Sequence, residues 1–205
     1  MFFSIIMQST LKDYPGAATD RANKLRRAIQ SVLNQSFDDW ELVIVADECA
    51  ETMLVAHEFD DSRIVTHLAE RPIKGKWYSY CRNVGNDLAA GRYRLYLDND
   101  DYFTPHYLRY LHEEISRDML DWYAVDHFYW CRSRWKYKHV ELRPNSAGTA
   151  NIVHSCAVRS RWPVAHHYGS EDWRFIKSII NELLTHRHIM LAGYCIAHIR
   201  GSYEI

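Results

Sequence analysis

The stretch that decides the fold is "RLYLDNDDYFTP", which runs over Arg94–Pro105. It is apolar and β-favouring as far as Leu97, and then carries carboxylates at Asp98, Asp100 and Asp101. Three neighbouring negative charges repel one another, so the cluster has an electrostatic cost unless a cation lies beside it. The segment is therefore either a solvated turn, in which aspartates are common, or a strand end that holds a divalent cation.

Strands and helices alternate on the N-terminal side of this segment. The run "WELVIVA" (Trp40–Ala46) is continuously apolar, as in a strand covered on both faces. In chain order we expect a strand at Phe2–Ser9, a helix at Ala18–Gln35, strands at Trp40–Ala46 and Arg63–Leu68, a helix at Trp77–Ala90, a strand at Tyr93–Asp98, and a helix from Pro105 to about Arg117. This alternation predicts an α/β fold with a largely parallel sheet, in which ligands bind beyond the carboxyl ends of strands.

The second half of the chain is less regular. The aromatic, alternating stretch Trp122–Leu142 predicts a β-hairpin that turns near Arg132–Arg134, and a loop follows it. The stretch Ser170–His186 has a helical apolar stripe that begins after a serine N-cap, and "YCIAHI" (Tyr194–Ile199) predicts a closing strand. The chain has no repeats and no linker, which favours a single domain over residues 1–205.

Composition excludes several classes of protein. The chain has 205 residues, 47% hydrophobic and 25% charged, with a net charge of −1, so it is typical of a globular domain and gives no global electrostatic argument for nucleic-acid binding. Its five cysteines are widely spaced without a CxxC pair, which favours reduced thiols and a cytoplasmic location. No apolar run reaches the roughly 20 residues of a membrane span. The pairs His166/His167 and His186/His188 lack a supporting Cys or His, so we expect surface or packing histidines there.

Four motifs occur in one order along the chain. They are "LRRAIQSVLNQSFDDWELVIVADE" (Leu25–Glu48), "CRNVGNDLAAGRYRLYLDNDD" (Cys81–Asp101), "SEDWRFI" (Ser170–Ile176) and "HIRGS" (His198–Ser202). Together they resemble the family-2 nucleotide-sugar glycosyltransferases with the GT-A fold. The resemblance implies an α/β, single-domain, Rossmann-like fold with a mostly parallel central sheet, helices on both faces and a small β-hairpin on the acceptor side. Residues 1–101 would form the donor half and residues 102–205 the acceptor half.

The resemblance implies a donor site around the acid cluster. Asp98 and Asp100 would hold Mn²⁺ or Mg²⁺ at the diphosphate, and His198 would complete the metal shell or be a satisfied strand-end histidine. The residues expected to bind the nucleotide sugar are Ser9, Thr10, Asp47, Arg82, Asp98, Asn99, Asp100 and Arg200. Arg82 has a structural ion pair as its alternative role, and Asp101 is either a further ligand or a helix cap. The chain departs from the family by having Ala46 before Asp47, where two aspartates are usual.

The resemblance also implies the catalytic and acceptor residues. Asp172 would be the general base of an inverting transfer, and Glu171 would bind the acceptor or orient the site, although acids at a helix start are common for structural reasons. Trp130 and Trp135 would stack on the acceptor, or would fill the core on the inner face of the hairpin.

We therefore expect a metal-dependent inverting transferase that moves one sugar from a nucleoside-diphosphate sugar, with UDP the commonest carrier, to a carbohydrate, lipid-linked or other hydroxyl acceptor. Because the family's processive Gln-x-x-Arg-Trp motif is absent, a single transfer is favoured. Two alternatives stay open. One is a non-catalytic module of the same fold that binds nucleotide sugars or glycans, and the other is an enzyme that acts on modified nucleic-acid bases through the basic aromatic hairpin.

Overall fold

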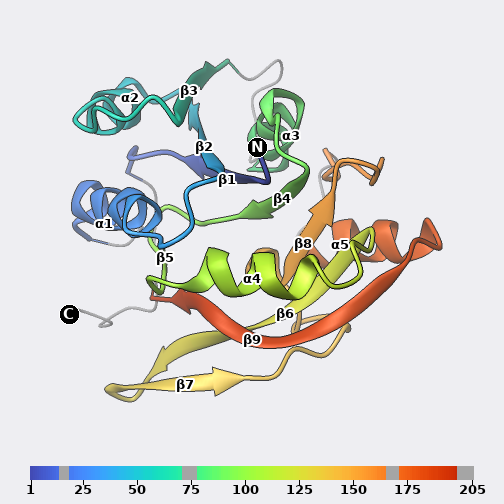
Figure 1. Cartoon of the computed structure of the whole chain (residues 1–205). Helices are drawn as coiled ribbons and strands as arrows, with labels where there is room; N and C mark the ends of the chain where they lie inside the picture. The colour runs from blue at the N-terminus through green and yellow to red at the C-terminus, as the bar shows by residue number, and fades with distance from the viewer. Residues whose placement is uncertain (14–18, 71–77, 165–170, 198–205) are drawn as a thin grey trace.

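The computed structural model describes residues 1–13, 19–70, 78–164 and 171–197. The elements are β1 (Phe3–Ser9), α1 (Arg21–Leu33), β2 (Trp40–Asp47), α2 (Ala50–Ala56), β3 (Ile64–Ala69), α3 (Tyr78–Leu88), β4 (Tyr93–Tyr96), β5 (Tyr102–Phe103), α4 (Tyr107–Ile115), β6 (Trp122–Cys131), β7 (Arg134–Lys138), a 3-10 turn (Thr149–Asn151), β8 (Ile152–Ser155), α5 (Glu171–Asn181) and β9 (His186–Ile196) (Figure 1). In these ranges the strands form one nine-stranded sheet in the order β3-β2-β1-β4-β8-β6-β9-β5, with β7 paired to β6.

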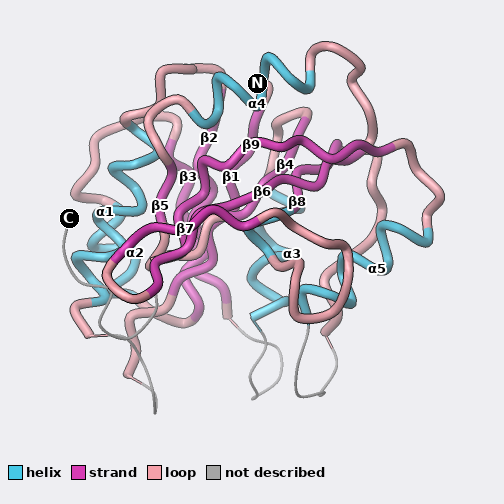
Figure 2. The backbone as a smooth tube through the Cα atoms, turned by 90° about the horizontal axis from the view of Figure 1, so that it is seen from below, coloured by secondary structure: helices cyan, strands magenta, loops and turns pink. Residues whose placement is uncertain are grey.

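The N-terminal part of the sheet is parallel, as the alternation predicts. Strand β1 lies between β2 and β4, with Ile5 opposite Leu42 on one side and Leu95 on the other. All eight residues of β2 are buried, because helices cover both of its faces. Apolar residues of α1, α2 and α4 pack on one face, and Cys81 of α3 packs on the other. Figure 2 shows the backbones of α1 and α3 on opposite sides of β1 and β2. The predicted α/β class and the two helical layers are confirmed.

The C-terminal part of the sheet is mixed. Strand β8 pairs antiparallel with β4 and β6, whereas β6 and β9 run parallel through an irregular register. The predicted hairpin is confirmed as β6–β7, and its turn residues Arg132 and Ser133 have φ of 51° and 61°, which suits a tight hairpin turn.

Several elements differ from the expectations. Helix α5 ends at Asn181, five residues before the expected end, since Leu183 takes a left-handed φ of 55° that stops the helix. Strand β9 therefore begins at His186 and not at Tyr194. Helix α2 and strand β8 were not predicted, because both are too short to show a clear period. The expected N-cap at Ser170 lies outside the described residues.

A buried polar chain fixes β4 against β8. The Nδ1 of His154 lies 3.1 Å from the carbonyl oxygen of Ser155, which can only accept, so Nδ1 carries the proton. The other ring nitrogen lies 2.9 Å from the hydroxyl of Tyr96, which accepts a hydrogen bond from Asn86 at 3.0 Å. Burial lowers the pKa of His154 to about 4, so the folded protein keeps this imidazole neutral.

This buried histidine predicts acid sensitivity. Because the pKa is about 4 when folded and 6.5 in the reference state, the unfolded chain takes the proton first as pH falls. We expect His154 to lower the free energy of unfolding by about 2 kcal/mol between pH 7 and pH 5. Urea unfolding at both pH values should show a smaller drop in His154→Gln than in the unmodified protein. The exposed His67→Gln is the control, and an equal drop in all three proteins would contradict the prediction.

Candidate active site

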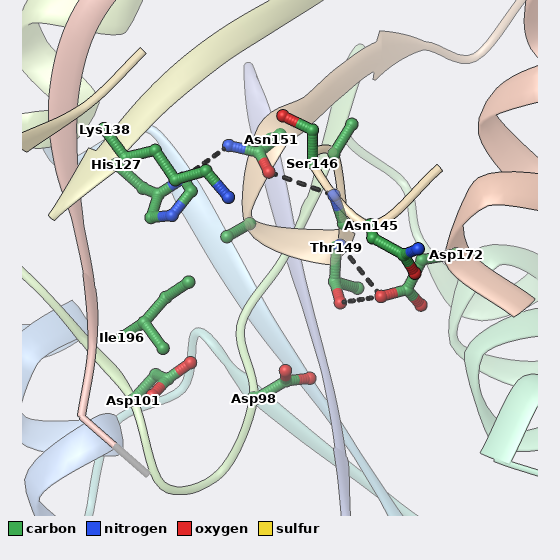
Figure 3. Close-up of a pocket in the computed structure, with 13 residues that line it drawn as sticks. Asp98, Asp101, His127, Lys138, Asn145, Ser146, Thr149, Asn151, Asp172 and Ile196 are labelled. Atoms are coloured by element: carbon green, nitrogen blue, oxygen red, sulfur yellow. Dashed lines mark hydrogen bonds between the residues drawn. The ribbon is translucent and has the colours of Figure 1, made fainter. Parts of the chain in front are cut away.

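A cavity of about 230 Å³ lies where the carboxyl end of β4 faces the start of α5. Figure 3 shows Asp98 and Asp101 on one side of it and Thr149 and Asp172 on another, with His127 and Lys138 further along the wall. Its lining thus joins the acid cluster and the helix-start acid, which are far apart in sequence. The two acids lie on one cavity because β4 and β8 are neighbours in the sheet, and because Thr149, just before β8, is hydrogen-bonded to Asp172 of α5.

Arg82 of α3 connects the two sets of acids. One of its guanidinium nitrogens lies 3.2 Å from Oδ1 of Asp98, and another lies 3.3 Å from Oδ1 of Asp172. Its side chain is only 12% exposed and lies on the ring of Trp162, 4.5 Å from the ring centre. Burial acts to lower the pKa of Arg82, but the charges of Asp98 and Asp172 outweigh it and raise the pKa above the usual value. Arg82 therefore stays charged, and its guanidinium pairs with both carboxylates.

Asp172 lies in the first turn of α5, where the helix N-terminus favours negative charge. Its Oδ2 lies 3.4 Å from the backbone nitrogen of Thr149 and 3.3 Å from the Thr149 hydroxyl (Figure 3). A Cβ at Gly148 would approach the same oxygen to 3.2 Å, so this position suits a residue without a side chain. The carboxylate is 36% exposed and faces the cavity, so an incoming molecule can reach it.

The three acids of the cluster have different environments. Asp101 is 1% exposed, and its oxygens accept hydrogen bonds from the Ala197 backbone at 2.7 Å and the Tyr194 hydroxyl at 3.0 Å. Through these hydrogen bonds Asp101 connects the segment after β4 to the end of β9. Asp98 is 40% exposed and lines the cavity. Asp100 is partly exposed, and its backbone carbonyl accepts a hydrogen bond from Arg27 at 2.6 Å.

The expected nucleotide-binding residues lie at neighbouring strand ends. Ser9 ends β1 and Asp47 ends β2, and both are buried. Asn99 donates a hydrogen bond of 2.8 Å from its side chain to the hydroxyl of Ser9, which joins the acid segment to β1. Thr10 is also largely buried. His198 and Arg200 lie outside the described residues.

The expected acceptor residues lie apart from the cavity lining. Glu171 accepts a hydrogen bond of 2.8 Å from Ser79. Trp130 and Trp135 are cross-strand partners in the hairpin with ring centres 5.3 Å apart, and Trp135 also meets the Tyr102 ring at 5.8 Å. Both indoles are partly exposed, so they form an aromatic surface near β5 and do not fill the core.

Ten residues of the cavity lining were not expected from the sequence, among them His127, Lys138, Thr149 and Asn151. The side-chain amide of Asn151 lies 2.8 Å from the His127 ring, and burial lowers the pKa of His127 to about 4. These residues come from the hairpin and from the loop before β8, where no motif marks them. The one available signal was the polar composition of "RPNSAGTAN" beside the hairpin.

The fold and site agree with the comparison against known families. The profile described as "Glycosyl transferase family 2" matches residues 17–195. The chain belongs to this family. The family resemblance and the GT-A fold expected from the sequence are thereby confirmed, and the family is one of transferases.

Two curated relatives match shorter stretches. "Protein CgeD" of Bacillus subtilis (strain 168) is 35% identical over 104 residues, which are 47% of this chain and 24% of that protein. "UDP-Glc:alpha-D-GlcNAc-diphosphoundecaprenol beta-1,3-glucosyltransferase WfgD" of Escherichia coli is 37% identical over 75 residues, which are 36% of this chain and 28% of that protein. The matched stretches thus span about a quarter of the length of these relatives.

Solved structures share the fold across nearly the whole chain. S. aureus TarS 1-349 in complex with UDP-GlcNAc has a TM-score of 0.74 at 18% identity, and the match covers 100% of this chain and 62% of that chain. The mannosyltransferase PcManGT from Pyrobaculum calidifontis, in complex with GDP-Man and Mn2+, has a TM-score of 0.66 at 11% identity, over 98% of this chain and 58% of that chain. At these identities the likeness concerns the fold. Among the described residues, the helices are too short or too polar to cross a bilayer.

Proposed function

We propose that this chain transfers one sugar from a nucleoside-diphosphate sugar to a hydroxyl acceptor, with inversion at the anomeric carbon. The observation that carries the proposal is the position of Arg82, which pairs with Asp98 at the strand end and with Asp172 at the helix start on one cavity. A transferase needs a cation that stabilises the charge of the leaving diphosphate and a base for the acceptor. Asp98 would help to hold that cation, and Asp172 would be the base.

Asp172 is the general base in this proposal. It is exposed toward the cavity and fixed by Arg82 and Thr149, so it can accept the proton of an acceptor hydroxyl as that oxygen attacks the sugar. The N-terminus of α5 and the guanidinium of Arg82 lie beside this carboxylate. Glu171, bonded to Ser79, lies next to it and is proposed to orient the acceptor.

The donor set beside Asp98 fits a hard divalent cation. Asp98 and Asp100 offer carboxylate oxygens, which Mg²⁺ and Mn²⁺ prefer, whereas Asp101 is used by structural hydrogen bonds. Bound there, the cation would stabilise negative charge on the departing nucleoside diphosphate. Ser9, Thr10 and Asp47, at the neighbouring strand ends, are proposed to bind the nucleoside. UDP is the favoured carrier, since WfgD is named for a UDP-Glc donor and TarS binds UDP-GlcNAc.

A thermal-shift screen tests the donor site. Uridine, guanosine, cytidine, adenosine and thymidine diphosphates are each added with Mn²⁺, with Mg²⁺ or with chelator. A ligand at 100 times its Kd adds about 2.7 kcal/mol to the free energy of unfolding. We expect this stabilisation with UDP and metal, and its loss in chelator, in Asp98→Ala and in Asp100→Ala.

The control for the screen is Asp87→Ala, because Asp87 pairs with Arg161 at the surface and lies outside the cavity lining. It should keep the response to UDP and metal. If no nucleotide stabilised the protein with either Mn²⁺ or Mg²⁺, the result would contradict the proposed donor site. A response that survives chelator would contradict the metal dependence alone.

A further inference from the structure

A second group of metal-ligating side chains lies in the C-terminal part of the sheet. Asp126 comes from β6, His188 from β9 and His139 from the segment after β7, and we name these three residues the histidine–aspartate cluster. Nε2 of His188 lies 2.7 Å from Oδ1 of Asp126, and Nδ1 of His139 lies 3.4 Å from Oδ2. The two imidazole rings are 4.5 Å apart, and one ligand atom from each residue lies within 4.8 Å of the others.

The carboxylate at the centre of this cluster is fully buried. Asp126 is 0% exposed, and the backbone nitrogen of Val140 donates to its Oδ1 at 2.8 Å, while the Tyr137 hydroxyl donates to Oδ2. These hydrogen bonds hold both oxygens of the buried carboxylate in place. A buried anion beside two imidazole nitrogens is a favourable position for a cation.

We propose that the histidine–aspartate cluster binds a zinc-class divalent ion, that is, a borderline-soft ion such as Zn²⁺ or Co²⁺. Two imidazoles and one carboxylate form an established protein ligand set for these ions, whereas Mg²⁺ prefers oxygen ligands alone. Ligand atoms at about 2.0–2.1 Å from a tetrahedral ion lie about 3.3 Å apart. The nitrogen-to-oxygen distances of 2.7 Å to Oδ1 and 3.4 Å to Oδ2 of Asp126 bracket that value, so small rotations of the two partly exposed rings complete the arrangement.

Spacing along the sequence could not reveal this site. His188 was assigned a surface or packing role because no Cys or His follows at a supporting distance in the chain. Its partners come from two other segments, which the β6–β7 hairpin and the β6–β9 pairing bring to it. The register of β6 against β9 shifts on both sides of Asp126, and such irregularities commonly redirect a side chain.

The cluster is linked to the cavity through adjacent residues. His127 follows Asp126 and Lys138 precedes His139, and both of these neighbours line the cavity near Asp172. An ion that joins β6, β9 and the segment after β7 would therefore fix one wall of that cavity. We expect the ion to stabilise the fold and to leave the donor-site metal independent, since the two ligand sets share no residue.

The test uses the full chain, stripped of metal with chelator and titrated with Zn²⁺ by calorimetry and with Co²⁺ by visible absorption. The unmodified protein should bind one ion at this cluster, with the Co²⁺ spectrum of a tetrahedral nitrogen and oxygen site. His139→Gln and His188→Gln should each weaken binding by at least about tenfold. Two controls should keep it: His186→Gln, because His186 stacks on Trp122 with ring centres 4.4 Å apart, and Asp98→Asn, which alters the donor site.

Two results would overturn the proposal. One is the absence of Zn²⁺ and Co²⁺ binding by the unmodified protein. The other is binding at a different place. If both glutamine variants retained binding, the ion would lie elsewhere, for example on the cysteines, and if Asp98→Asn removed binding, the ion would lie at the donor site. Neither result bears on the nucleotide screen with Mn²⁺ and Mg²⁺, so the two proposals fail independently.

Discussion

Replacing Asp172 with asparagine should lower kcat for sugar transfer by about 10² to 10⁴, the usual contribution of a positioned general base. Asparagine has the same shape and can still accept the hydrogen bonds from Thr149, but it cannot take a proton. Nucleotide binding should change little, because the expected diphosphate contacts lie at the end of β4. The measurement is release of nucleoside diphosphate from the donor that the thermal screen selects, with an array of sugar and lipid-linked acceptors.

The matched control for this loss is Asp87→Asn. Asp87 is also paired with an arginine, Arg161, but that pair lies on the surface and outside the cavity lining. The control should transfer sugar at the unmodified rate. If Asp172→Asn kept full transfer, the assignment of the base would be wrong. If it and the unmodified protein both bound nucleotide without transfer to any acceptor, the non-catalytic binding module would be the better description.

The parallel half of the fold was predictable from the sequence because its strands are continuous apolar runs with helical periods between them. Trp40–Ala46 is an example, since this strand is buried on both faces and Glu41 is its one polar residue. The first eight residues of strand β9 were not predicted as strand, for the opposite reason. It mixes exposed and buried residues, such as Met190 at 79% and Ile189 at 3% exposed, right after an amphipathic helix.

The candidate site was predictable only where it coincides with motifs. Asp98 and Asp172 belong to motifs, and the structure brings both to one cavity. An ion pair was one of the two roles expected for Arg82, but its partners were not predictable, because Arg82 lies on a third element, α3, 16 residues from Asp98 and 90 residues from Asp172 along the chain. Asp101 illustrates the converse. Its charge made it a candidate ligand, but the partners that use it, such as Tyr194, come from the far end of the chain.

Replacing Arg82 tests whether this link matters for transfer. Lysine keeps the charge but has a single ammonium group, so it cannot pair with Asp98 and Asp172 through separate nitrogens as the guanidinium does. We expect Arg82→Lys to lower kcat by about 10-fold to 100-fold, because displacing a catalytic group by about 1 Å can cost 10²-fold. Arg82→Met, which keeps apolar contact with Trp162 but removes the charge, should lower kcat further than Arg82→Lys does. The matched control is Arg161→Met, which breaks the surface pair with Asp87 and should leave transfer unchanged.

A double-mutant cycle separates positioning from simple structural support. If Arg82 acts by holding Asp172 in place, its removal should cost little further activity once Asp172 is already asparagine, since residues that act as a unit are strongly non-additive. Urea unfolding of each variant, measured beside kcat, gives the effect of each substitution on the free energy of unfolding. A fall in stability with unchanged kcat per folded molecule would show that Arg82 only supports the fold. Fully additive losses of kcat in the double variant would show that Arg82 acts independently of Asp172. Non-additive loss of kcat with retained folding would identify Arg82 as the residue that positions the base.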